Sequence, residues 1–290
     1  MTNREKVFLI DALRNKYKLN ELLPVLKLSK SSYCYQVQCI KSKDKYKELR
    51  QQIKELFMCN KEIYGYRRIH CLLRKDGIIV SEKIVRRIMN EEQLIVKAAR
   101  KRKYNSYKGE ITPEVDNIIK RDFSAKKPNE KWLTDVTEFK YYVGTEIRKL
   151  YLSAILDLYD RRIATYKIME SNNNELVFST FDEAVRLNPD AHPIFHSDRG
   201  FQYTNKLFHQ KLTDAGMIQS MSRVGRCIDN GPMEGWWGIL KSAMYYLRKF
   251  TDKTELISAI EEYITYYNTR RYQIKLSSMT PMEYHEAYAA

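Results

Sequence analysis

Asp135, Asp198 and Glu234 are the acidic residues of this 290-residue chain whose surroundings best suit chemistry at phosphorus. Asp198 follows a short apolar run, and 35 residues separate it from Glu234. Mg²⁺ prefers oxygen ligands and is usually held by one or two carboxylates together with substrate phosphates. Two such ions, about 4 Å apart, activate the attacking oxygen and stabilise the leaving oxygen of an in-line displacement. The three residues therefore predict a catalytic site with two Mg²⁺ or Mn²⁺ ions.

Each of these carboxylates is weak evidence alone, because the chain has 36 acidic residues and most acidic residues are solvated. Plausible rivals are Glu138, Asp157, Asp160 and Asp229. The neighbours of Asp198 favour it: His196 and Arg199 can orient a carboxylate or a phosphate, and Gly200 lets the backbone approach closely. We expect Arg199 to contact DNA.

Lys241 lies seven residues after Glu234, about two turns along the same helix face. The helix is predicted to begin near Pro232, after the turn signal Asn230-Gly231, so that Glu234 lies in its first turn. A lysine there would contact the DNA that leads into the site. The alternative is a surface lysine on a solvated helix.

The positive charge of the chain is concentrated in its N-terminal part. Residues 1–130 contain 31 Lys and Arg against 16 Asp and Glu, a net charge of +15. Residues 131–290 contain 20 of each, so their net charge is zero. This distribution indicates an anion-binding module beside a body with its own chemistry, although a solvated basic surface is the alternative.

Two helical segments are predicted in the basic part. Residues 1–44 contain three short apolar repeats typical of either a helix-turn-helix or a plain bundle. Residues 45–105 contain three more helices, the last of which presents Lys83, Arg86 and Arg87 outward, as a recognition helix does. The following run supplies further expected DNA contacts at Arg100, Lys101, Arg102 and Lys103. We place a basic linker at residues 106–125.

The periodicity changes after Lys131. Apolar strands are predicted at residues 132–139, 150–156, 163–168, 193–196 and 218–221, and helices at residues 174–187, 205–215, 232 onward and 258–267. This order predicts an α/β fold with a mixed five-stranded sheet and flanking helices, in residues 126–250. Residues 251–290 form a helical extension. Ligands bind at strand ends in open sheets, so the three carboxylates would converge at one edge.

Other classes of site and compartment are disfavoured. The five cysteines form no pair with two residues between them, and His192 and His196 have no cysteine pair beside them, which argues against a zinc site. No run of about 18 apolar residues is present, and the N-terminus lacks a secretory signal. We expect a cytoplasmic, nucleoid-associated protein with no membrane contact.

The three acidic segments resemble the catalytic blocks of DDE transposases. The closest resemblance is to the second-frame (OrfB) products of the IS-three family of insertion sequences, in the IS-one-fifty-like branch. Asp-Val-Thr-Glu-Phe, His-Ser-Asp-Arg-Gly-Phe-Gln-Tyr and Asp-Asn-Gly-Pro-Met-Glu-Gly-Trp-Trp-Gly carry it, with the 35-residue gap and Lys241. Tyr-Gly-Tyr-Arg-Arg-Ile at residues 64–69 and Thr280-Pro281 extend it over nearly the whole chain.

The resemblance implies an RNase H-like catalytic core, shared with retroviral integrases, after an all-α helix-turn-helix region. It implies metal binding by Asp135, Asp198 and Glu234, end-DNA contact by Lys241, and partners that include terminal inverted repeats, target DNA and further copies of the chain. Many relatives have Ser-Phe-Phe after the glutamate, whereas Gly235, Trp236 and Trp237 stand here. We expect the Trp pair to pack in the core, with stacking on an unpaired base as the alternative.

The implied function is metal-dependent DNA cleavage and strand transfer in transposition. A catalytically inactive DNA-binding regulator and a nuclease that cannot join strands are the alternatives. No leucine-zipper repeat is evident at the N-terminus, and family members usually gain one from the first reading frame. The first-frame product, as a partner or as a fusion, is therefore also implied.

Overall fold

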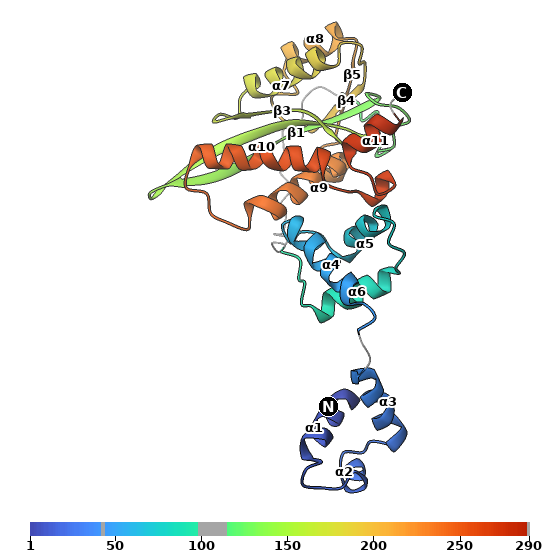
Figure 1. Cartoon of the computed structure of the whole chain (residues 1–290). Helices are drawn as coiled ribbons and strands as arrows, with labels where there is room; N and C mark the ends of the chain where they lie inside the picture. The colour runs from blue at the N-terminus through green and yellow to red at the C-terminus, as the bar shows by residue number, and fades with distance from the viewer. Residues whose placement is uncertain (42–43, 98–114, 289–290) are drawn as a thin grey trace. The chain divides into compact units, whose positions relative to one another are not determined.

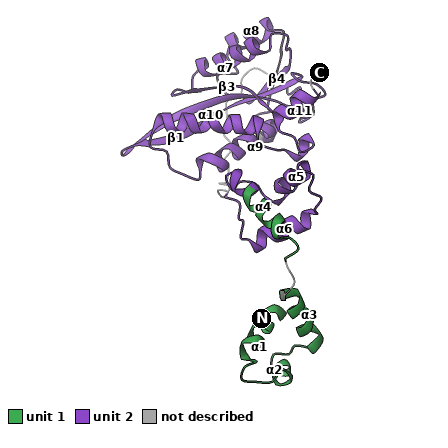
Figure 2. Ribbon diagram, viewed as in Figure 1, with its two compact units in different colours: residues 1–55 green, residues 56–290 purple. Residues whose placement is uncertain are grey.

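The computed structural model describes residues 1–41, 44–97 and 115–288. Contacts divide the chain into two compact units, residues 1–55 and 56–290 (Figure 2). The division falls inside the helix α4 (Lys47–Cys59). The five-part division that we infer from the sequence remains a prediction. Arg100, Lys101, Arg102 and Lys103 lie outside the described residues, as does much of the expected linker.

The first unit contains three short helices, α1 (Asn3–Leu13), α2 (Leu19–Val25) and α3 (Lys30–Lys41). The side chain of Thr2 accepts from the backbone of Glu5 and thereby caps α1. The helices enclose a small apolar core, which consists of Val7, Ile10, Leu22, Leu23, Leu28 and Tyr33. This arrangement agrees with the three apolar repeats predicted there.

In the second unit, α5 (Tyr66–Lys75) and α6 (Glu82–Glu91) form a helix-turn-helix-like pair. Gly77 adopts a φ of +78° in the connection, a conformation that glycine reaches without strain. The buried side chains of the two helices are Ile69, Leu73, Val85, Ile88 and Met89. Lys83, Arg86 and Arg87 are exposed on α6, as expected from the sequence.

A mixed five-stranded sheet forms the centre of the second unit, as predicted, and its strand order is β3-β2-β1-β4-β5. The first three strands pair antiparallel, whereas β4 pairs parallel with both β1 and β5. The strands are β1 (Lys131–Val143), β2 (Glu146–Asp157), β3 (Ile163–Met169), β4 (Ile194–Ser197) and β5 (Ile218–Met221).

Helices cover both faces of this sheet (Figure 1). On one face, α7 (Asn174–Leu187) and α8 (Lys206–Asp214) pack with Trp132 and Ile155. On the other, α9 (Gly231–Leu240) and α10 (Lys253–Thr269) pack with residues such as Leu133. Because both faces of β1 are covered at its start, residues 131–134 are buried on both sides of the sheet.

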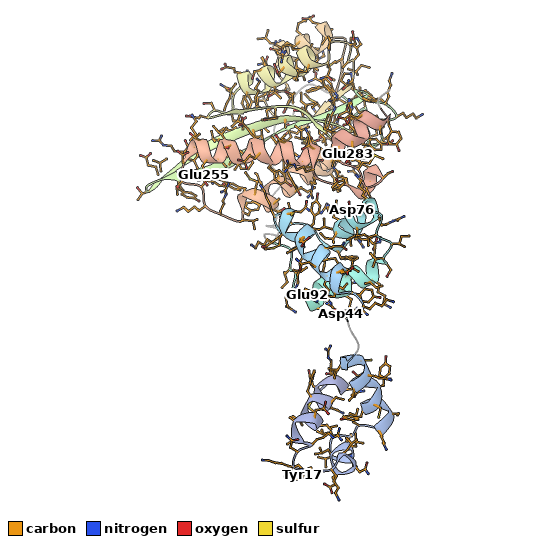
Figure 3. All side chains as sticks on the ribbon, viewed as in Figure 1. Tyr17, Asp44, Asp76, Glu92, Glu255 and Glu283 are labelled. Atoms are coloured by element: carbon orange, nitrogen blue, oxygen red, sulfur yellow. The ribbon has the colours of Figure 1, made fainter. Side chains whose placement is uncertain are left out.

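The C-terminal segment contacts both the sheet and α5. Asn268 exchanges two hydrogen bonds with the backbone of Ile163, in the manner of a neighbouring strand. On the other side, Tyr64 donates to the carbonyl of Arg270, and Lys75 pairs with Glu283, which follows the start of α11 (Pro281–Tyr288) (Figure 3). The Thr280-Pro281 motif thus lies in a segment that joins α5 to the catalytic fold. No helix in the described part of the chain is long and apolar enough to cross a membrane.

Candidate active site

The sheet register brings Asp135 and Asp198 to the same level. Leu133 in β1 pairs with His196 in the parallel strand β4. Asp135 comes two residues after Leu133, and Asp198 comes two residues after His196. Burial raises the pKa of Asp135 to about 8, and the nearby charge of Asp198 acts in the same direction. The pKa of Asp198 is raised as well, by desolvation from neighbouring groups, although the residue is exposed. A half-buried and an exposed carboxylate therefore face the same small region at the strand edge.

Glu234 joins them from the first turns of α9. Its pKa is raised by partial burial and then by the charge of Asp198. Two hydrogen bonds fix the entry to this helix: Asn230 Nδ2 donates to the carbonyl of Thr134 (3.0 Å), and His196 Nε2 donates to the carbonyl of Asp229 (3.0 Å). The strand that holds Asp135 and the strand that ends just before Asp198 thus also position the start of the glutamate's helix.

Gly200 packs closely beside Asp198. Its backbone N–H donates to Asp198 Oδ1 (2.9 Å). A Cβ atom at Gly200 would lie 3.1 Å from both Asp198 Oδ1 and Gln202 Oε1. The close approach expected from the sequence is therefore present, and it orients the carboxylate with a neutral donor.

None of the three carboxylates forms an ion pair with any residue that the structure describes, and this separates them from Glu138, Asp160 and Asp229 but not from Asp157. Glu138 pairs with Lys149 (2.9 Å), and Asp160 with Arg162 and His285. Asp157 accepts from the backbone of Asn129 and Tyr159. Carboxylates in a desolvated position without a cationic partner are costly unless they bind protons or a cation.

The donor set suits a hard divalent cation in chemical type, because it supplies three carboxylates that form no ion pair with the residues the structure describes. As the side chains stand, no three Asp, Glu, His or Cys residues within the described ranges form a closed metal-binding group. Like charges oppose closer approach of the three side chains. Burial is the larger cause of the raised pKa of Asp135, and the charge of Asp198 adds to it.

His196 and Arg199 serve the fold around the site. His196 is fully buried, and its Nδ1 lies 2.8 Å from Ser220 Oγ. Arg199 donates to the carbonyls of Ser222 (2.9 Å) and Val115 (3.0 Å). These bonds hold the segment after β5 and the start of the catalytic region; DNA contact by Arg199 remains a prediction.

Asp229 is a structural residue that sequence reasoning left among the candidate metal ligands. Its fully buried carboxylate accepts from Arg223 (2.8 Å) and Arg121 (2.7 Å), and also from Asn117 (3.0 Å). These bonds, first of all that from Arg223, hold the pKa of Asp229 well below its usual range. The residue joins the two segments that lead into β1 and α9.

Asp229→Asn is therefore expected to lower the free energy of unfolding at pH 7 by about 2 kcal/mol, a value discounted because both guanidinium groups are about half exposed. A depressed carboxyl pKa contributes stability above the unfolded pKa and loses it as pH falls. The difference between wild type and variant should thus persist from pH 7 to pH 5 and shrink below the ordinary value of 3.8. Urea unfolding measures it, with the exposed Asp190→Asn as control; a difference independent of pH down to pH 3 would contradict the prediction.

Lys241 directly follows α9 and lies near β1 and Asp135; a shared face with Glu234 remains a prediction. Its Nζ is 5.1 Å from the centre of the Phe139 ring, and partial burial lowers its pKa while Asp135 opposes that shift. A π-helical turn, η2 (Lys241–Tyr245), begins here. The hydroxyl of Tyr245 bonds both backbone groups of Lys140, which holds this turn against β1.

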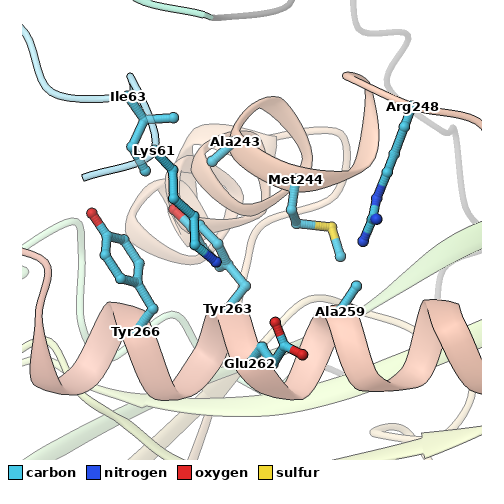
Figure 4. A pocket seen from close by; sticks show the side chains of 9 residues that line it. All are labelled: Lys61, Ile63, Ala243, Met244, Arg248, Ala259, Glu262, Tyr263 and Tyr266. Atoms are coloured by element: carbon cyan, nitrogen blue, oxygen red, sulfur yellow. The ribbon is translucent and has the colours of Figure 1, made fainter. Parts of the chain in front are cut away.

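The two tryptophans after Glu234 are both buried, which agrees with core packing. Their ring centres are 4.5 Å apart. Trp237 also donates its indole N–H to Asp135 Oδ2 (2.9 Å), a bond that the sequence did not indicate. A small cleft elsewhere, lined by residues such as Lys61, Met244 and Tyr263, contains none of the three carboxylates (Figure 4).

Comparison with known proteins matches these features. Residues 125–227 and 234–287 match models described as integrase core domain, and residues 44–104 match one described as HTH-like domain. The chain is 40% identical to the transposase InsK of insertion sequence element IS150 from Escherichia coli (strain K12), over 95% of this chain and 96% of that protein. The chain belongs to the DDE transposases of insertion sequences. It is thus a polynucleotidyl transferase of the IS150-like branch.

Other transposases share this similarity. The transposase of IS1353 from Shigella flexneri is 41% identical to this chain. The matched region covers 99% of this chain and 56% of that longer protein. The IS904 transposase of Lactococcus lactis is 33% identical over 81% of this chain and 92% of its own length. The catalytic core domain of HTLV-2 integrase, solved with magnesium, matches 55% of this chain and 97% of that domain, at 21% identity and a TM-score of 0.42.

Proposed function

We propose that Asp135, Asp198 and Glu234 hold two divalent metal ions, Mg²⁺ or Mn²⁺, with which this transposase cleaves and joins DNA at the ends of its element. The single observation that best supports the proposal is the placement, around one strand edge, of three carboxylates close enough to affect one another's pKa, with no ion pair among the described residues. Bound metal ions would activate the attacking oxygen and stabilise the leaving oxygen.

The chain itself supplies position. The pairing of β1 with β4 aligns the two aspartates, and Asn230 anchors the helix of Glu234 beside them. In the first reaction, a water oxygen attacks the phosphodiester and a 3′-hydroxyl leaves. In the second reaction, the freed 3′-hydroxyl of the element attacks a phosphodiester of the target DNA, and the 3′-oxygen of the target strand leaves. No side chain becomes covalently attached to DNA.

The remaining partners follow from the same proposal. The α5–α6 pair would bind the terminal inverted repeats through Lys83, Arg86 and Arg87, while the core would engage target DNA. Several copies of the chain would assemble on the DNA, with the first-frame product as a partner or as a fusion. DNA cleavage and joining would take place in the cytoplasm, at the nucleoid.

Strand joining on duplex oligonucleotides that carry the element's ends, in Mg²⁺ with the full chain, tests the proposal. Nicks that yield a 3′-hydroxyl, followed by joined products, would support it. Nicking without joining would indicate a nuclease. Specific binding without nicking, in Mg²⁺ and in Mn²⁺, would indicate an inactive regulator.

Lys241 is proposed to contact the DNA that leads to the scissile phosphate. Lys241→Ala should lower joining about tenfold, because one charge-assisted contact is lost. Lys241→Glu should lower it further through repulsion, whereas Lys241→Arg should be tolerated, since arginine keeps the charge at a phosphate contact. Joining by the three variants at low and moderate salt is the measurement. Unchanged joining by Lys241→Glu at both salts would place this side chain away from DNA.

A further inference from the structure

Trp236 and Trp237 occupy successive positions in α9, yet their indole N–H groups differ in what they meet. Trp236 is 2% exposed and its Nε1 is buried without a hydrogen-bond partner in the described structure. Trp237 is 7% exposed, and its Nε1 donates to Asp135 Oδ2 at 2.9 Å. A buried donor usually has a partner, and of these two only the Trp237 indole has one among the described residues. Trp236 therefore offers a control for the loss of an indole N–H without the loss of a hydrogen bond.

The bond fixes the Asp135 carboxylate without neutralising it. The other oxygen, Oδ1, accepts from the backbone N–H of Val136 at 2.8 Å. Both donors are neutral, and two carboxylate oxygens offer about four lone-pair positions. The plane of the carboxylate is therefore held by two bonds, while its charge and its remaining lone pairs stay available to a cation.

The same bond joins the two elements that carry Asp135 and Glu234. Trp237 lies three residues after Glu234, and side chains at this spacing are neighbours on a helix surface. The indole is rigid, cannot ionise and cannot itself bind a hard cation, because it is a donor only. A fixed distance between β1 and α9 at this point sets how far apart the two carboxylates lie.

We propose that Trp237 is a positioning residue that orients Asp135 for a divalent cation through its indole N–H, an inference that rests on the proposed metal ligation by Asp135. Groups that hydrogen-bond to a metal ligand typically change metal affinity or activity by about 10–100-fold when they are removed. Trp237 acts through Asp135 and is not itself expected to contact substrate.

Trp237→Phe and Trp236→Phe form a matched pair for the test, since each removes one indole N–H from the same helix and keeps an aromatic ring. Mn²⁺ binding to the full chain, measured by electron paramagnetic resonance of the free ion, should weaken about tenfold or more in Trp237→Phe and stay within about twofold of wild type in Trp236→Phe. The Mg²⁺ concentration for half-maximal joining should rise in the same proportion, while affinity for end DNA stays unchanged.

Wild-type Mn²⁺ affinity in Trp237→Phe, or an equal loss in both variants, would overturn the inference, because packing alone would then explain the residue. If Trp237→Phe does not fold, benzothienylalanine at position 237 replaces the N–H by sulfur in a ring of nearly the same shape, and the same criteria apply. An Asp135→Asn arm separates the two proposals. Wild-type Mn²⁺ affinity in that variant would remove the proposed ligation, and this inference with it. Loss in Asp135→Asn without loss in Trp237→Phe would overturn the inference alone.

Discussion

Asp198→Asn is expected to lower strand cleavage and joining by about a thousandfold or more, while the affinity for end DNA stays close to that of wild type. Asparagine keeps the shape of the side chain, and its oxygen can still accept from Gly200. The substitution removes the negative charge that a divalent cation needs. Asp135→Asn and Glu234→Gln should have effects of the same order, because each removes one of the proposed metal ligands.

Folding and chemistry can be separated in this experiment. Asp198 is exposed, and Asp198→Asn removes one of two like charges that lie close together, so the free energy of unfolding without metal should not fall. Glu138→Gln is the matched control on β1, since Glu138 pairs with Lys149 and should be dispensable for joining. Joining at the wild-type rate by any of the three variants would show that the wrong carboxylate has been assigned.

The local elements of the catalytic fold could be predicted from the sequence because their signals are local. Residues 174–187 form α7 as predicted, from apolar spacing alone, and the cap is the preceding residue, Asn173. The strand of residues 218–221 was also predicted with its observed bounds. By contrast, β1 and β2 extend beyond their predicted ends into a hairpin turned at Gly144, where charged residues such as Lys140, Glu146 and Arg148 interrupt the apolar runs.

The geometry of the site depends on pairing over long distances, which the sequence does not encode in any readable pattern. Alignment of Asp135 with Asp198 requires the parallel register between β1 and β4. The bond from Trp237 to Asp135 joins residues 102 positions apart. Arg199 and Asp229 illustrate the same limit, since their types suit a phosphate or a metal, whereas the structure gives them backbone and arginine partners.

Replacement of Lys83, Arg86 and Arg87 by alanine together is expected to weaken binding to end DNA by two orders of magnitude or more at low salt, with a smaller salt dependence. Each phosphate contact contributes about 0.9 to the slope of log affinity against log salt, so three lost contacts should lower the slope by between two and three. All three side chains are exposed, and the buried face of α6 keeps Val85 and Ile88.

The fold should tolerate this triple substitution, because alanine favours a helix and the lost pair between Arg87 and Glu91 is long, at 3.6 Å, and solvent-exposed. Filter binding over a salt series measures the slope, and strand joining at saturating DNA shows whether the core still works. Alanine at Lys126, Lys127 and Lys206 removes the same charge from exposed positions outside α6 and serves as the control.

An equal loss of slope in both triple variants would mean that general positive charge, and not the face of α6, holds the DNA. A slope unchanged in the α6 variant would move DNA recognition to another surface. The expected result, a reduced slope in the α6 variant alone, would assign end binding to this helix and leave the carboxylate edge for the chemistry.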